Sequence, residues 1–158
     1  MTGRCFLLFT FHLSLIVLLL GCSHLMHPKS GEYLEQAQGA DGLETLLNLT
    51  AMMEATVQGA RGSAAYESNL HKLHDQFHAL HEAMCGVSEA QAAHPDYVKA
   101  VTLEKELRTV FHRLWDFQRD DTLRDVHLNL FAARLQELRS TLQSVRGAAL
   151  ARPRDSCA

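Results

Sequence analysis

The segment DFQRDDTLRD, residues 116–125, decides how many helices the carboxyl-terminal half of the chain contains. It holds neither glycine nor proline. A 3-4 spacing runs through it at Leu114, Phe117, Asp121, Arg124 and Leu128. Asp121 and Arg124 interrupt the apolar face at two successive steps, and Asp120 or Asp121 is a favourable N-cap for a new helix. The pattern therefore predicts a turn here, and one uninterrupted helix of about 50 residues is the alternative.

Around this segment, apolar residues recur every three or four positions in four stretches of residues 41–147, which is typical of amphipathic helices. The first stretch begins at Asp41, with Glu44 in capping-box spacing. The second follows Ser63, the third begins at Pro95, and the fourth ends near Gly147. The expected core positions are Leu43, Leu46, Thr50, Met53, Val57 and Ala60; Tyr66, Leu70, Leu73, Phe77, Leu80 and Met84; Leu103, Leu107, Val110, Phe111, Leu114, Trp115 and Phe117; and Leu128, Phe131, Leu135, Leu138, Leu142 and Val145. The prediction is an all-α fold, an antiparallel up-down four-helix bundle.

The first 22 residues, MTGRCFLLFTFHLSLIVLLLGC, place Arg4 ahead of an apolar run that extends to Leu20. Such a run is typical of an export signal, with an uncleaved anchor as the alternative. Leu19-Leu20-Gly21-Cys22 resembles the lipobox of bacterial lipoproteins. This resemblance implies cleavage before Cys22, lipidation of its sulfur, and, with Ser23 next in the chain, attachment to the periplasmic face of the outer membrane.

The expected organisation has four parts. Residues 1–21 are a lipoprotein signal peptide, residues 22–40 a lipidated flexible tether, residues 41–147 the helix bundle, and residues 148–158 a tail that carries Cys157. In such a bundle the second and fourth helices end at the same pole, and disulfides persist in exported proteins. We therefore expect a disulfide between Cys85 and Cys157. The formal net charge of −3 gives no reason to expect a nucleic-acid partner.

The segment NLHKLHDQFHALHEAMC, residues 69–85, carries the side chains that most clearly indicate a chemical function. Its histidines are His71, His74, His78 and His81. At about 100° per residue, His74 and His81 lie roughly 70° from the centre of the buried helix face, and His71 and His78 lie roughly 130° from it. None of the four therefore belongs to the core. Imidazoles three or four residues apart on a helix can chelate Cu, Ni or Zn. The additional candidate ligands are Glu82, Cys85, His112 and His127.

Two resemblances bear on function. The segment LHEAM…VSEAQ, which ends at Gln91, resembles the histidine-rich, membrane-anchored sensors of nickel, cobalt and copper stress and their periplasmic relatives. This similarity implies metal sensing or buffering. The segment HPDYVKAVTLEKELRTVF, residues 94–111, resembles the all-helical pilotin lipoproteins of type III secretion, which implies an adaptor that grips a partner helix in an apolar groove.

Three further interpretations complete the expectations. The histidines are also consistent with a solvated helix flank that binds nothing. A haem-binding four-helix protein is a further alternative, although the chain has no CxxCH motif. The chain also lacks activated-serine, phosphate-loop, CxxC and HExxH motifs, so we expect a non-enzymatic role with the membrane and a periplasmic or outer-membrane protein as partners.

Overall fold

The computed structural model describes residues 29–62 and 64–151, which form six helices and no strand within those ranges. The helices are α2 (Ser30–Ala37), α3 (Gly42–Ala60), α4 (Tyr66–Cys85), α5 (Glu89–Ala92), α6 (Pro95–Asp116) and α7 (Asp121–Ala151). The prediction of an all-α fold is therefore confirmed for this part of the chain, with two short helices added to the four long ones. None of the helices in these ranges combines the length and the apolar character that crossing a bilayer requires.

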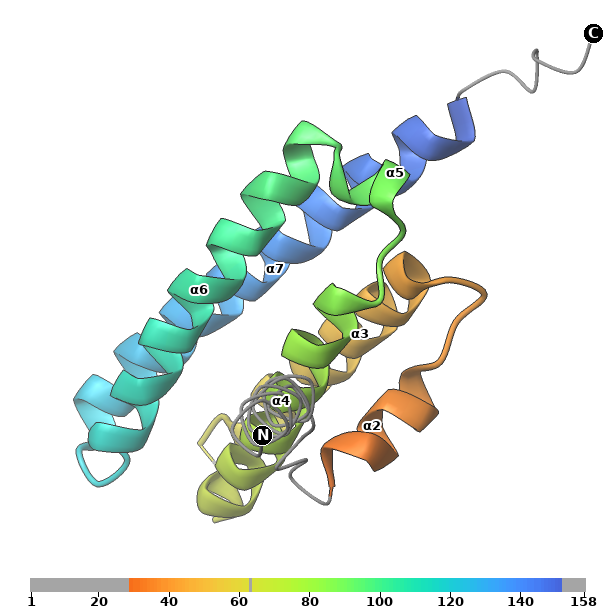
Figure 1. Cartoon of the computed structure of the whole chain (residues 1–158). Helices are drawn as coiled ribbons and strands as arrows, with labels where there is room; N and C mark the ends of the chain where they lie inside the picture. Colours follow the sequence, from red (N-terminus) through yellow and green to blue (C-terminus); the bar gives the residue numbers. More distant parts are fainter. Residues whose placement is uncertain (1–28, 63, 152–158) are drawn as a thin grey trace, which may run out of the picture.

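The segment 116–125 separates two helices, as predicted. α6 ends at Asp116 and α7 begins at Asp121. The backbone N–H of Leu123 donates to Asp120 Oδ1 at 3.0 Å, so Asp120 caps α7. α7 then returns alongside α6 (Figure 1). The alternative of one uninterrupted helix is wrong, because a capping carboxylate stands where the apolar face is interrupted.

The apolar faces of the long helices meet in one core. All predicted core positions of α3, from Leu43 to Ala60, are buried, and so are those of α7 from Leu128 to Val145. Three predicted core residues differ: Met84, near the end of α4, is only partly buried, and Trp115 and Phe117 are each 37% exposed. Trp115 and Phe117 lie at and just beyond the end of α6, where the chain turns away from the core. Position in a 3-4 pattern therefore does not ensure burial at a helix end.

Residues 30–37, which the sequence places in a flexible tether, form α2 instead. This helix lies against α3 and α4 (Figure 1). Ala37 is 1% exposed, and its carbonyl accepts a hydrogen bond of 3.0 Å from Asn48 Nδ2 on α3. On α4, the polar residues Asp75 and Gln76 are buried beside the small residues of the same helix. α2 covers a side of α4 that the expected four-helix core leaves uncovered.

The helix starts follow local sequence signals. Asp41 Oδ1 accepts the N–H of Glu44 at 2.7 Å, and Glu44 in return accepts the N–H of Ala40 at 2.8 Å. Ser88 and Gln91 form a full capping box at α5. Pro95 occupies the first turn of α6, where its missing N–H costs nothing. The predicted helix starts at Asp41 and Pro95 are confirmed.

The end of α7 differs from the prediction. The helix continues through Gly147 to Ala151, so Gly147 does not terminate it. An interior glycine costs about 1 kcal/mol relative to alanine, which the alanine-rich sequence around it can sustain.

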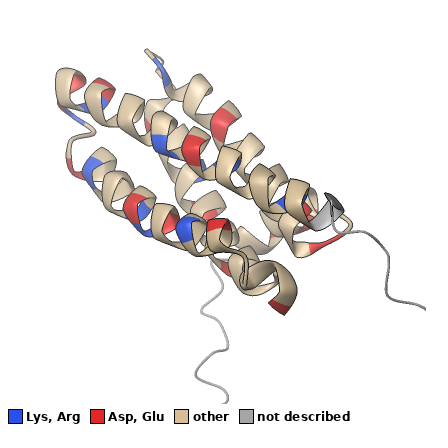
Figure 2. Cartoon of the chain, turned by 90° about the horizontal axis from the view of Figure 1, so that it is seen from above, with Lys and Arg blue, Asp and Glu red and all other residues tan. Residues whose placement is uncertain are grey.

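The helices carry both signs of charge, with Lys and Arg interleaved with Asp and Glu along the same helices (Figure 2).

Candidate functional site

The histidines of α4 lie beside the buried face of the helix and not within it. Leu73, Phe77 and Leu80 point into the core, whereas His71, His78 and His81 are exposed and His74 is half-buried. The helical register placed all four outside the core, and this prediction is confirmed. Their surroundings, however, divide them into one close pair and two separate rings.

His74 and His78 form the close pair. Their Nε2 atoms are 3.3 Å apart, and the ring centroids are separated by 4.6 Å in an edge-on arrangement. The opposite nitrogen of His74, Nδ1, lies 3.7 Å from Oδ1 of the buried Asp75. The carboxylate therefore faces one nitrogen of this ring while the other nitrogen faces His78. A carboxylate behind a histidine is a common means of orienting an imidazole toward a metal.

The other two histidines make different contacts. The ring of His71 meets Trp115 of α6 edge-on, with 5.0 Å between centroids. Arg108 Nη2 lies 3.1 Å from His81 Nδ1 and donates to Glu104 Oε1 at 3.0 Å. Glu104 Oε1 is itself 3.3 Å from His81 Nδ1, so the arginine and the carboxylate meet the same ring nitrogen. His71 and His81 are thus drawn toward α6 at two separate points, and the four predicted ligands do not converge.

Two adjoining hollows of about 210 Å³ and 400 Å³ lie between α4 and α6. His74, Phe111 and His112 line both, so they form one depression, which we call the histidine groove. Its walls are His71, His74, Phe77, His78, His81, Arg108, Phe111, His112 and Trp115. Five imidazoles and one guanidinium therefore surround a floor of aromatic rings.

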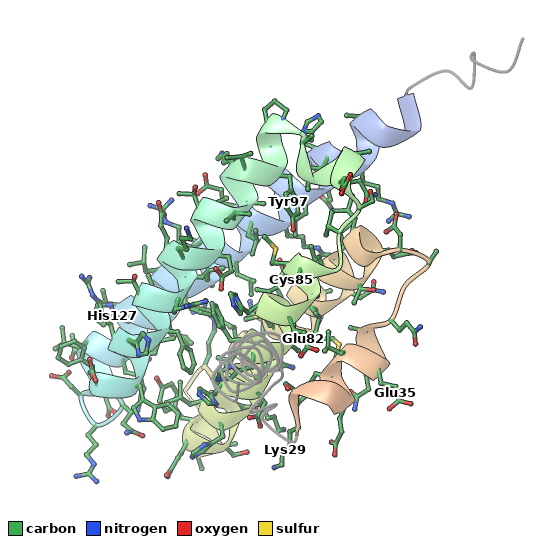
Figure 3. The ribbon with its side chains drawn as sticks, viewed as in Figure 1. Lys29, Glu35, Glu82, Cys85, Tyr97 and His127 are labelled. Carbon is green, nitrogen blue, oxygen red and sulfur yellow. The ribbon has the colours of Figure 1, made fainter. Side chains whose placement is uncertain are left out.

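Of the additional ligands expected from the sequence, His112 alone lines the groove. His127 stacks on Phe117 at a centroid distance of 5.3 Å, well away from Cys85 (Figure 3). Cys85 is exposed on the last turn of α4, with Sγ 4.0 Å from the carbonyl of His81. Glu82 lies on α4 one turn before the helix ends (Figure 3). Among the described residues, no three His, Cys, Asp or Glu side chains are arranged to hold a metal ion.

Two predicted modifications fall outside the described residues. Cys22, the expected lipidation site, precedes them, and Cys157, the expected disulfide partner of Cys85, follows them. Lipidation and the disulfide therefore stay predictions.

The sequence alone did not identify several residues at or beside the histidine groove. Arg108 and Glu104 stand four residues apart on α6 and pair with each other, and both lie close to His81 Nδ1. Their helical spacing signals an ion pair. It does not show that the pair faces the histidines, because that depends on how α6 packs beside α4. Phe111 was expected only as a core residue, and it also forms the floor of the groove.

A second depression, of about 960 Å³, lies between α3 and α7. We call it the alanine groove, because Ala51, Ala55, Ala132 and Ala133 line it. Glu54 of α3 and Arg139 of α7 also line it, and the two form an ion pair.

Neither groove can be interpreted through a relative. In comparisons with known proteins, no family model, no curated protein and no solved structure matches this chain. The function must be argued from the side chains themselves.

Proposed function

We propose that this protein is a lipid-anchored, non-catalytic helical protein of the bacterial periplasm that binds Cu, Ni or Zn in the histidine groove. Its role would be sensing or buffering of the metal. The proposed scaffold is an up-down four-helix bundle of α3, α4, α6 and α7, held at the outer membrane through lipid on Cys22. The observation that carries the metal site is the 3.3 Å between the Nε2 atoms of His74 and His78.

This separation is the one expected of two imidazole nitrogens that bind the same metal ion. A tetrahedral ion with metal–nitrogen bonds of about 2.0–2.1 Å holds two nitrogen ligands about 3.3 Å apart. The two imidazoles are one helical turn apart on a rigid helix, so little ordering is needed to bring them together. Asp75, behind His74, supports the orientation of that ring.

The surroundings favour an exchangeable site over a structural one. Structural zinc is enclosed by four protein ligands, whereas His78 is exposed and the groove opens to solvent. An ion held by few ligands at a surface can be released or passed on. Such behaviour suits sensing, buffering or delivery.

The single tryptophan of the chain provides a direct test, because the Trp115 ring centroid lies 5.0 Å from that of His71 and 6.0 Å from that of His74. Titration of the full chain with Cu²⁺ should quench Trp115 fluorescence with a defined stoichiometry. The melting temperature should rise with Cu²⁺, Ni²⁺ or Zn²⁺, because a ligand that binds the folded state stabilises it.

The variant His74→Ala/His78→Ala should lose both the quenching and the thermal shift. His127→Ala, which removes an imidazole outside the groove, is the matched control and should bind like the parent chain. If the double variant is quenched and stabilised as strongly as the parent, the metal proposal is wrong and the histidines are a solvated flank.

The lipid anchor is tested independently. In bacterial cells supplied with a labelled fatty acid, the parent chain should carry the label and fractionate with the outer membrane. Cys22→Ser should carry none. A parent chain without the label would remove the anchor from the proposal and leave the metal site unaffected.

The second candidate is an adaptor that holds the helix of a partner protein, and the alanine groove favours it. Small side chains permit the close approach of another helix. Ala55 is exposed, so Ala55→Trp should fill this groove without disturbing the core. In cells that lack the protein, an adaptor predicts failure of complementation by Ala55→Trp and success of the histidine double variant. Under excess copper or zinc, metal binding predicts that Ala55→Trp complements and that the histidine double variant fails.

Haem binding is not part of the proposal. A haem enclosed between helices needs an axial histidine that points inward. In the described ranges no histidine is buried.

A further inference from the structure

We propose that His112 of α6 becomes a third ligand beside His74 and His78, so that metal binding clamps α4 to α6 across the histidine groove. This inference rests on the proposed function and adds its regulation. Metal occupancy would change how firmly two helices of the molecule are held together, which is the signal that a sensor needs.

The position of His112 supports the first part. This residue lines both hollows of the groove, and His74 is the one histidine of α4 that also does so. His78 lines the smaller hollow with them. The three imidazoles therefore border the same space of about 210 Å³ from two different helices.

The packing between α4 and α6 supports the second part. These helices lie further apart than α3 and α4 or α6 and α7 (Figure 1). Side chains make the contacts that cross the gap, such as the stacked rings of Phe77 and Phe111, with 6.1 Å between centroids. A space lined by imidazole and aromatic rings replaces the close interdigitation found elsewhere in the core.

Hydrogen bonds hold the two ends of this gap. Tyr97, near the start of α6, donates to the carbonyl of Met84, near the end of α4, at 2.6 Å. Tyr66, at the start of α4, donates to the carbonyl of Leu114, near the end of α6, at 3.4 Å. Between these two points lie the histidines. The middle of the gap is thus the place where an added ligand bridge would strengthen the contact.

The three rings do not yet form a ligand shell among the described residues. His112 is exposed, so rotation of its side chain into the groove meets little resistance. Binding would therefore begin at the preformed pair of α4 and be completed by His112. A site completed by movement couples metal binding to structure.

The test uses Zn²⁺ and the full chain. Isothermal titration calorimetry should show that His112→Ala binds Zn²⁺ at least about tenfold more weakly than the parent, while His127→Ala binds like the parent. Hydrogen exchange should show slower exchange of the amides of residues 106–114 when Zn²⁺ is added to the parent. In His112→Ala this protection should be absent even at saturating Zn²⁺.

The outcomes separate the two proposals. If His112→Ala binds Zn²⁺ as tightly as the parent, or keeps the added protection of α6, the clamp is wrong while a two-histidine site on α4 stands. If the parent binds none of Cu²⁺, Ni²⁺ and Zn²⁺, both the clamp and the metal function are wrong.

Discussion

At the scale of a single residue, Gly42 determines how closely α3 can approach the end of α4. A Cβ atom at this position would lie 2.3 Å from the carbonyl oxygen of Gly86 and 2.7 Å from its carbonyl carbon. Both atoms are backbone, so no side-chain rotation can relieve the contact. The first turn of α3 can therefore lie against the end of α4 only because residue 42 has no side chain.

Gly42→Ala should accordingly destabilise the protein. The backbone of α3 or of the segment after α4 must shift, and overpacking of this kind costs about 1–3 kcal/mol. Urea unfolding followed by circular dichroism measures the change as a lower midpoint.

Gly147→Ala is the matched control, because a Cβ atom there meets nothing within 4 Å beyond the neighbouring backbone of its own helix, and the residue lies inside α7. This substitution should increase the free energy of unfolding by up to about 1 kcal/mol through helix propensity. Equal effects of the two substitutions would show that the close approach at Gly42 is not a constraint.

At the scale of an element, α2 depends on few contacts. It has eight residues, too short to be helical by itself in water, so its helical state comes from packing against α3 and α4. Ala37 is the residue of α2 whose backbone bonds to α3 and whose side chain is fully covered. An element of this kind can open separately from the rest of the fold.

Ala37→Asp should release α2 from the surface of α4. A carboxylate at this buried position lacks a partner and costs on the order of 2 kcal/mol. Hydrogen exchange should become fast throughout α2 and should change little in α6 and α7. Gln36→Asp places the same charge at the neighbouring exposed position and should leave exchange in α2 as in the parent. Unchanged exchange in Ala37→Asp would mean that α2 is not held through this contact.

At the scale of the whole molecule, Tyr66 and Tyr97 join α4 and α6 at both ends of the gap between them. Burial raises the pKa of each tyrosine to about 12; at Tyr66 the charge of Arg124 opposes this effect and that of Asp125 adds to it, and at Tyr97 Cys85 adds to it. A tyrosine in an unfolded chain has a pKa of about 10. The neutral hydroxyl is therefore favoured in the folded state.

Stability should consequently fall in alkali. Between pH 10 and 12 the unfolded chain loses protons that the folded chain keeps, so the free energy of unfolding decreases as pH rises. Below pH 10 this contribution is fully present. Urea midpoints measured from pH 8 to 11.5 should be nearly level up to pH 10 and fall beyond it.

Tyr66→Phe/Tyr97→Phe should be less stable at neutral pH, because each lost hydrogen bond costs about 1 kcal/mol. Its midpoint should fall less steeply above pH 10, with Tyr33, whose pKa burial also raises, accounting for part of the remaining slope. An equally steep fall in the double variant would assign the alkaline loss of stability to other groups.

The features that the sequence by itself determined are local. The cap at Asp120, the capping box of Ser88 and Gln91, and the 3-4 apolar faces all depend on residues within one or two helical turns of each other. The pairing of His74 with His78 belongs to the same class, because one helical turn brings the rings together whatever the rest of the fold does.

The tertiary structure alone decided the features that join distant segments. α2 is helical because α3 and α4 cover it, and Trp115 meets His71 because α6 lies beside α4. Arg108 and His112 reach the histidine groove by the same packing, from about 30 residues further along the chain than the histidines of α4. Helical periodicity specifies the face of a helix on which a side chain lies. It does not specify which other helix that face meets, because this depends on how the whole set of apolar faces is buried at once.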